Sequence, residues 1–135
     1  MDKTDDEQLI YKLALHLLPG IGPVSARNLV SYCGGVKEIF HTRKSDLQRI
    51  PFIGTERAKE ILKYKNFNKI QEELDHIKRN KIETLFYRDK NYPQRLRNCE
   101  DAPILLFYKG NADLNSEKII SIVGLEKARN KQIRF

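Results

Sequence analysis

Two glycines and two prolines stand within five residues in the run LPGIGP, at Pro19, Gly20, Gly22 and Pro23. Apolar residues at helical spacing precede and follow this run, so it connects two predicted helices. The first turn of a helix carries unpaired N–H groups and the positive end of the helix dipole, which both suit a phosphate oxygen. Glycine lacks the Cβ that would keep an anion away from the backbone. The run is therefore either a phosphate-binding backbone or, more plainly, a tight connector.

The first copy of this turn offers five candidate nucleic-acid ligands, and a second copy follows 32 residues later. LPGIGPVSARNLV (18–30) aligns without a gap with IPFIGTERAKEIL (50–62), which indicates one helix–turn–helix unit used twice. Ile21 is expected to point inward, and Phe52, which replaces the first glycine, is expected to pack, so the second copy is also open to a purely structural role. The candidate ligands are Gly20, Ile21, Gly22, Ser25 and Arg27 in the first copy and Gly54, Thr55 and Arg57 in the second.

Helical patterns fill the first part of the chain and strand patterns the second. Helices are predicted from Thr4, as the cap of a capping box with Glu7, to Pro19; from Pro23 to Gly34; over 36–40; over 45–50 with Ser45 as cap; and over 68–80. Short β-branched or aromatic runs predict strands over 82–87, 104–110 and 118–124, with a Pro-started helical turn between the first two. The boundary at residue 80 divides the chain into units 1–80 and 81–135.

The first turn resembles the helix-hairpin-helix motif, in which apolar-x-Gly-apolar-Gly leads into a helix with an early Ala. Leu18, Gly20, Ile21, Gly22 and Ala26 fit that pattern. The resemblance and the repeat together imply that residues 1–80 form an all-helical tandem helix-hairpin-helix (SAM-like) domain.

The second unit resembles the DNA-processing protein DprA (Smf) family. The motifs of that family, in its order, are a Tyr-Pro-x-x-Leu segment, an Asp-x-Pro turn, a strand ending in Lys-Gly and a strand ending in Ile-Val-Gly. They stand here at 92–96, 101–103, 106–110 and 122–124. With the preceding hairpins, the resemblance covers about residues 5–124. It implies an α+β chain in which residues 81–135 form an incomplete Rossmann-like α/β segment.

The resemblance also implies a function. Members of the family bind incoming single-stranded DNA, protect it and help to load the RecA recombinase in natural transformation, and they are not thought to be enzymes. Their DNA contacts cluster after the Ile-Val-Gly strand, which makes Gly124 a candidate nucleic-acid ligand here. This sequence departs from the family at that point, since Glu126 replaces the expected Arg.

The segment after residue 80 is too short for the two βαβαβ halves of a complete doubly wound sheet. A truncated, functionally impaired member is therefore expected. Its apolar strands would leave open edges, and we expect self-association through them.

Composition narrows the function classes. The 135 residues carry a net charge of +7, which favours anionic partners. No apolar run reaches the ~20 residues of a membrane span, and the acidic start MDKTDDEQ does not fit a signal peptide, so a cytoplasmic location is expected. We predict no metal, because Cys33 and Cys99 lie far apart and the three histidines are irregularly spaced. We predict no cofactor, because the sequence has no Gly-rich dinucleotide loop with a downstream acid, and no catalytic group, because it has no Ser/His/Asp or Cys/His arrangement.

Two other function classes stay open at this stage. The helical repeat would also suit a protein-interaction module, and a helix-hairpin-helix nuclease or glycosylase-type enzyme fragment is a further alternative. The preferred form of DNA is open as well, because hairpin modules suit the backbone of a duplex whereas the family resemblance implies single-stranded DNA.

Overall fold

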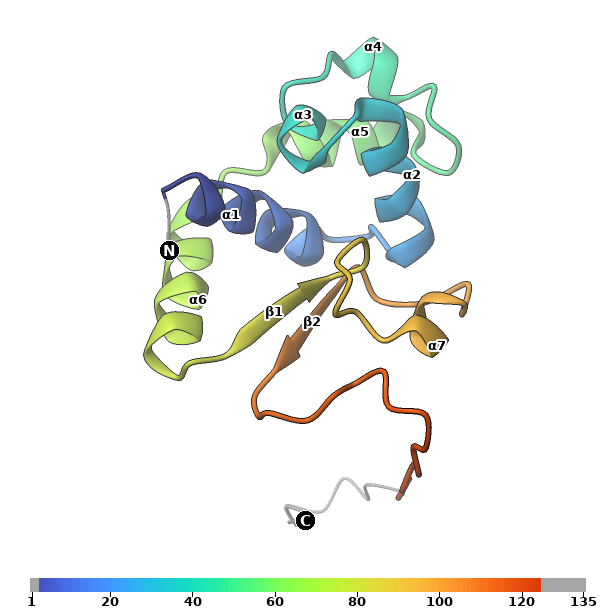
Figure 1. The fold of residues 1–135 in the computed structure, drawn as a ribbon. Helices are drawn as coiled ribbons and strands as arrows, with labels where there is room; N and C mark the ends of the chain where they lie inside the picture. Colours follow the sequence, from blue (N-terminus) through green and yellow to red (C-terminus); the bar gives the residue numbers. More distant parts are fainter. Residues whose placement is uncertain (1–2, 125–135) are drawn as a thin grey trace.

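Helix α1 (Lys3–Leu17) lies between two layers of the computed structural model, which describes residues 3–124 (Figure 1). Helices α2 to α5 stand on one side of it and a small sheet on the other. The consecutive residues Leu13, Ala14 and Leu15 are all buried. Because neighbouring residues point about 100° apart on a helix, these three cover more than half of its circumference. Helix α1 is therefore enclosed from opposite sides, and its burial is not confined to one stripe.

Four helices make up the layer above α1. They are α2 (Pro23–Cys33), α3 (Val36–Ile39), α4 (Lys44–Leu47) and α5 (Gly54–Lys63). Helix α2 begins at Pro23 and stops before Gly34, as the sequence predicts. Gly34 is the C-cap, with a left-handed backbone, and its N–H donates to the Val30 carbonyl.

Two expected caps are wrong. Thr4 and Ser45 lie inside α1 and α4, and Arg43 stands at the N-cap of α4 without a side-chain cap. Glu7, the expected partner of Thr4 in a capping box, instead accepts a hydrogen bond of 2.6 Å from Lys37 and so links α1 to α3.

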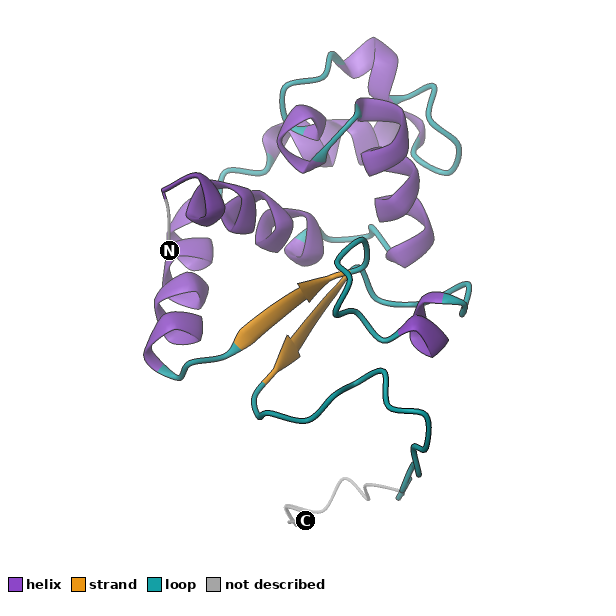
Figure 2. Ribbon diagram, viewed as in Figure 1, coloured by secondary structure: helices purple, strands orange, loops and turns teal. Residues whose placement is uncertain are grey.

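The rest of the described chain adds two helices and two strands. They are α6 (Phe67–Arg79), β1 (Glu83–Phe86), α7 (Gln94–Arg97) and β2 (Leu105–Tyr108) (Figure 2). Ile70, Leu74 and Ile77 are buried on one face of α6, as predicted. The strands pair antiparallel, with Phe86 opposite Leu105. Helices and a small sheet in one chain make the fold mixed α+β.

The two copies of the repeat share a backbone feature that the sequence hides. Gly20 and Phe52 occupy the same position, and both have a left-handed backbone, with φ of 73° and 70°. Ala26 and its counterpart Ala58 are both buried. The side chain of Phe52 is 67% exposed, so the expectation that it packs is wrong. The second turn thus places a bulky side chain where the first has glycine, in a conformation that bulky residues rarely adopt.

One hydrophobic core spans both halves of the chain. It joins buried residues of α1, α2, α5 and α6 to Phe86, Ile104 and Leu105 of the strand-bearing part. The Lys12 ammonium of α1 also lies 4.8 Å from the ring centre of Phe86. The units expected at 1–80 and 81–135 therefore meet across a shared core.

The segment 118–124 is not a strand in this structure, although its sequence predicts a buried one. It pairs with neither β1 nor β2, and Ile120 and Val123 are 90% and 91% exposed. Its apolar residues give it high strand propensity, but propensity forms a strand only where a neighbour supplies hydrogen bonds and a covering face. Among the described residues, no helix is long and apolar enough to cross a membrane.

The backbone at positions 20 and 52 gives a test by opposite substitutions. Gly20→Ala forces a Cβ into the left-handed region, so we expect the free energy of unfolding to fall by about 1–2 kcal/mol. Phe52→Gly removes that strain and loses little buried area, so the free energy of unfolding should not fall. Urea denaturation measures both, and a loss above about 1 kcal/mol in Phe52→Gly would show that the ring packs.

His16 of α1 gives a test by pH. Its ring meets that of Phe107 edge-on at 5.5 Å, and burial lowers the pKa of His16 below 6.5 while Glu73 of α6 raises it. The unfolded chain therefore binds a proton more readily, and stability should decrease as pH falls through 6.5. In NMR titrations we expect Phe107→Ala to raise the pKa of His16 and Glu73→Gln to lower it. Identical values in all three proteins would contradict this account.

Candidate nucleic-acid interface

The first tip, which we define as residues 19–23, joins α1 to α2 and leaves its backbone open. Gly22 is the N-cap of α2 with an extended backbone, and its carbonyl accepts a hydrogen bond of 2.9 Å from the N–H of Ala26. A Cβ placed on Gly20 or Gly22 would meet no atom within 4 Å. Ile21 is half-buried against the core, which agrees with its expected role of fixing the turn. An anion can therefore approach this backbone without displacing a side chain.

The strand-bearing part of the chain lies next to the first tip. Ile21, Gly22 and Pro23 line a cavity of about 180 Å³ together with Pro103 and Ile104. Ser25 and Arg27 are half-buried. Arg27 also acts on Tyr92, because its charge opposes the effect of burial, which raises the pKa of that phenol. The first tip is thus partly a joint between the two halves of the chain.

The second tip, which we define as residues 51–55, stands free of that contact. Pro51, Phe52, Gly54 and Thr55 are all exposed, and a Cβ on Gly54 would meet no atom within 4 Å. Gly54 itself is left-handed, with φ of 63°. The Arg57 guanidinium donates a hydrogen bond to the Phe52 carbonyl, so one of its five N–H groups holds the turn while the others remain available.

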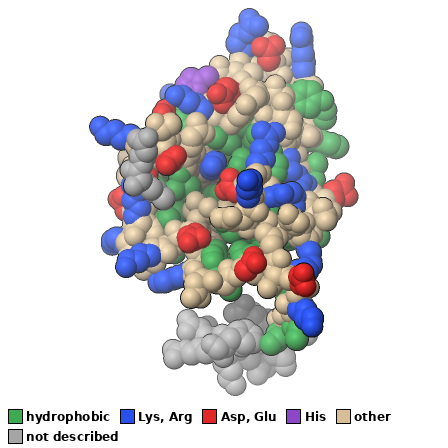
Figure 3. Space-filling model, viewed as in Figure 1, with side chains coloured by type: hydrophobic (Ala, Val, Ile, Leu, Met, Phe, Trp, Pro, Cys, Tyr) green, Lys and Arg blue, Asp and Glu red, His purple; other side chains and the backbone are tan. Residues whose placement is uncertain are grey.

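Charge also separates the two copies. Residues 18–36 carry one charged side chain, Arg27. Residues 43–65 carry seven Lys or Arg and three Asp or Glu, a net charge of +4, and all seven cations are exposed. One of them, Arg43, is paired with Asp46 at 3.2 Å. Blue side chains stand at the upper end of the face in Figure 3, where α4 lies. The second copy therefore offers the more basic surface.

Three aromatic and basic residues near α7 have structural partners. Tyr92 is fully buried and donates a hydrogen bond of 2.5 Å to the Pro103 carbonyl, so it cannot stack on a base from solvent. Arg97 donates to the carbonyls of Tyr87 and Asp89 and lies over the Tyr92 ring, at 5.6 Å from its centre. Arg95 donates to the carbonyls of residues 116 and 117. The structure therefore gives Tyr92, Arg95 and Arg97 partners within the chain itself.

Gly124, the last candidate from the sequence, is exposed at the end of segment 118–124 and lies in a different part of the chain from the two tips. A Cβ there would meet no atom within 4 Å. Glu126, which stands where the family has Arg, lies outside the described residues. The structure therefore groups the candidates at two tips and leaves Gly124 apart from them.

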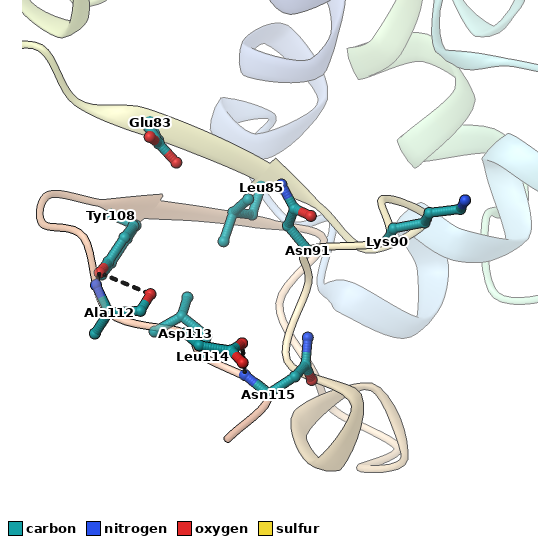
Figure 4. Close-up of a pocket in the computed structure, with 9 residues that line it drawn as sticks. All are labelled: Glu83, Leu85, Lys90, Asn91, Tyr108, Ala112, Asp113, Leu114 and Asn115. Carbon is teal, nitrogen blue, oxygen red and sulfur yellow. Dashed lines mark hydrogen bonds between the residues drawn. The ribbon is translucent and has the colours of Figure 1, made fainter. Parts of the chain in front are cut away.

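The sequence patterns do not point to a cavity of about 260 Å³ on the face of the sheet away from α1 (Figure 4). The Tyr108 hydroxyl closes one side of it by accepting from the N–H of Ala112, at 2.6 Å, and donating to its carbonyl, at 3.1 Å. Charges of both signs line the cavity, from Glu83, Lys90 and Asp113. Strand alternation could have located this face, but the loop that closes it has no sequence signature.

Comparison with known families places the second half of the chain. Residues 83–135 match the sequence model of the DNA recombination-mediator protein A family. This segment belongs to that family. The family segment, as we name residues 83–135, starts at the first residue of β1 and continues past the described residues. The sequence motifs predicted this membership.

Two curated relatives match about half of the chain. UvrABC system protein C of Wolbachia pipientis wMel is 37% identical over 67 residues, which are 50% of this chain and 11% of the relative. UvrABC system protein C of Anaplasma phagocytophilum (strain HZ) is 27% identical over 62 residues, 46% of this chain and 10% of the relative. The chain thus spans about a tenth of these relatives' length. Both matches exceed the 53 residues of the family segment, so each includes residues before 83.

No solved structure matches the chain. Within residues 3–124, no three His, Cys, Asp or Glu side chains lie close enough together to hold a metal ion.

The buried Tyr92 hydroxyl gives a test of how the family segment is held. Tyr92→Phe leaves the Pro103 carbonyl without its donor, so we expect the free energy of unfolding to fall by about 1–3 kcal/mol. Tyr32→Phe changes a tyrosine that is 65% exposed and should alter stability by less than about 0.5 kcal/mol. Urea denaturation compares the two variants, and equal effects would show that the buried hydrogen bond contributes nothing.

Proposed function

We propose that this chain is a DNA-binding accessory protein of the DNA recombination-mediator protein A family and that its tandem helix-hairpin-helix tips hold the DNA backbone. One observation carries the proposal: two repeated turns offer open backbone at the start of a helix, in a chain whose family segment belongs to a family of DNA recombination mediators. Backbone N–H groups contact phosphate without reading bases, so binding should be independent of sequence.

The ligands differ between the two tips. At the first, the N–H groups around Gly20, Ile21 and Gly22 would face a phosphate, with Ser25 and Arg27 beside them. At the second, Gly54 and Thr55 would take that role, and the remaining N–H groups of Arg57 would add charge-assisted hydrogen bonds. Exposure and charge both favour the second tip as the stronger contact, since residues 43–65 carry a net charge of +4. Gly124 would add a contact from the family segment.

The finer roles follow from the family resemblance. We propose that the DNA is incoming single-stranded DNA in natural transformation, that the chain acts in the cytoplasm without catalysing a reaction, and that RecA is a protein partner. The proposed units are a helical domain over 1–80 and the beginning of a Rossmann-like domain over 81–135. The exposed apolar residues of segment 118–124 support self-association as a further property.

A charge placed at each tip tests the proposal without disturbing the fold. Asp is a preferred N-cap, the backbone of Gly22 is extended, and its Cβ position is open, so Gly22→Asp should fold. Thr55→Glu places an acid in the first turn of α5, where the helix dipole favours it. We expect each variant to weaken the binding of a labelled 20-nucleotide strand by about tenfold in fluorescence anisotropy, because one phosphate contact is lost and one repulsion gained.

Neutral partners of similar shape are the controls. Gly22→Asn and Thr55→Gln keep the cap and the side-chain size without the charge, so they should weaken binding by less than about threefold. The dissociation constant of the unchanged protein should rise steeply between 50 and 200 mM salt. Salt-independent binding, or equal affinity in the acidic and neutral variants, would refute the tips as phosphate contacts.

A further inference from the structure

An aromatic pocket opens where α5 ends, at the opposite end of that helix from the second tip. Its volume is about 200 Å³. Tyr11 and Phe40 meet with ring centres 5.7 Å apart, and Tyr64 and Phe67 with ring centres 6.5 Å apart. We define the aromatic pocket by these four rings and the two polar residues that line it with them, His41 and Lys65. Tyr11 of α1, Phe67 of α6 and the C-cap residues of α3 and α5, Phe40 and Tyr64, thus bring four aromatic rings to one cavity.

The exposure and charge of the aromatic pocket indicate an anionic ligand with a flat apolar part. Phe67 is 41% exposed and Leu62, which also lines the pocket, is 37% exposed, so packing leaves their apolar surface open to a ligand. Lys65 and His41 line the pocket, and no carboxylate is among its described lining residues. The His41 ring is held by a hydrogen bond of 2.9 Å between its Nδ1 and the Lys37 carbonyl.

A row of exposed residues connects the second tip with the aromatic pocket. Thr55, Lys59 and Lys63 are spaced four residues apart, so they lie along one face of α5, and all three are exposed. The ten residues of α5 span about 15 Å. At the stacked duplex rise of 3.4 Å per nucleotide, this length corresponds to about four nucleotides, and an extended single strand would cover it with fewer. A strand whose phosphate is held at the second tip would thus follow the two lysines to the pocket.

We infer that the aromatic pocket takes an unpaired nucleobase of single-stranded DNA that runs from the second tip along α5. The inference rests on the proposed function, because the tip fixes the backbone that delivers the base. Every base has a face that can stack on an aromatic ring, so the pocket tolerates any sequence. A base in a duplex is paired and stacked, and taking it out costs a few kcal/mol. The pocket therefore selects single strands, whereas the tips alone serve either form of DNA.

Removing one ring of the aromatic pocket distinguishes base stacking in the pocket from phosphate binding at the tips. We expect Phe67→Ala to weaken binding of a 20-nucleotide single strand by about tenfold, and binding of the matching duplex by less than twofold. Phe67→Leu also removes the ring but keeps an apolar side chain at this partly exposed site. Like Phe67→Ala, it should weaken binding of the single strand and leave binding of the duplex nearly unchanged. Tyr32→Ala removes an exposed ring that lies outside the pocket and should change neither affinity. Equal losses for both DNA forms, or none for the single strand, would overturn the inference.

A mononucleotide tests the pocket without the tips. In NMR titrations with deoxyadenosine monophosphate, the ring signals of Tyr11 and Tyr64 should shift in the unchanged protein, and far less in Phe67→Ala. If the Tyr11 and Tyr64 signals shift but the protein binds no oligonucleotide, the proposed function is refuted, while the pocket still binds a nucleobase. Salt-sensitive oligonucleotide binding without these shifts would keep the proposed function and overturn the pocket, whose aromatic surface would then fit a side chain of a partner protein.

Discussion

The burial of α1 on opposite sides is the constraint on which the rest of the structure depends. Leu13, Ala14 and Leu15 are consecutive, so their burial requires one layer above the helix and another below it. The repeated helices supply the first layer, and α6 and the sheet supply the second. A polar residue at any of these three positions would be buried without a partner. Helix α1 thereby fixes the position of the helical repeat relative to the family segment, and this position determines where each tip lies.

Arginines bound to loop carbonyls are the second device that shapes the surface. Arg57 holds the second tip, and Arg95 and Arg97 tie α7 to segments on either side of it. A guanidinium has five donors in a rigid fork, so it can satisfy several backbone acceptors that a turn leaves unpaired. From the sequence alone, these arginines would be expected to bind phosphate, but here they donate hydrogen bonds to carbonyls of the chain. Among residues 83–124, a count of Lys and Arg therefore overstates the positive charge that is open to a ligand, since Arg95 and Arg97 bind carbonyls of the chain.

The sequence predicts the helices and the family well, and the partners of single residues poorly. Pro23, Gly34 and the apolar rows of α2 and α6 act locally, so their positions could be predicted from spacing alone. The burial of Tyr92 could not be predicted from the sequence, because its partner, the Pro103 carbonyl, is brought to it only by the fold. Segment 118–124 failed as a strand because a strand needs a neighbour, and none of the described residues provides one. The backbone of Phe52 could not be predicted either. It is left-handed like that of Gly20, although phenylalanine rarely adopts this conformation.

The two copies of the repeat differ more in what surrounds them than in the backbone at positions 20 and 52. The first is richer in glycine, but the family segment lies against it through Pro103 and Ile104, and a single arginine supplies its charge. The second has Phe52 in place of the first glycine, and seven exposed cations lie between residues 43 and 65. Glycine content ranks the first tip higher as an anion site, whereas exposure and charge rank the second higher. Because both tips expose glycine backbone to solvent, the proposed preference for the second tip depends mainly on its positive charge, and the first tip also joins the family segment to the helices.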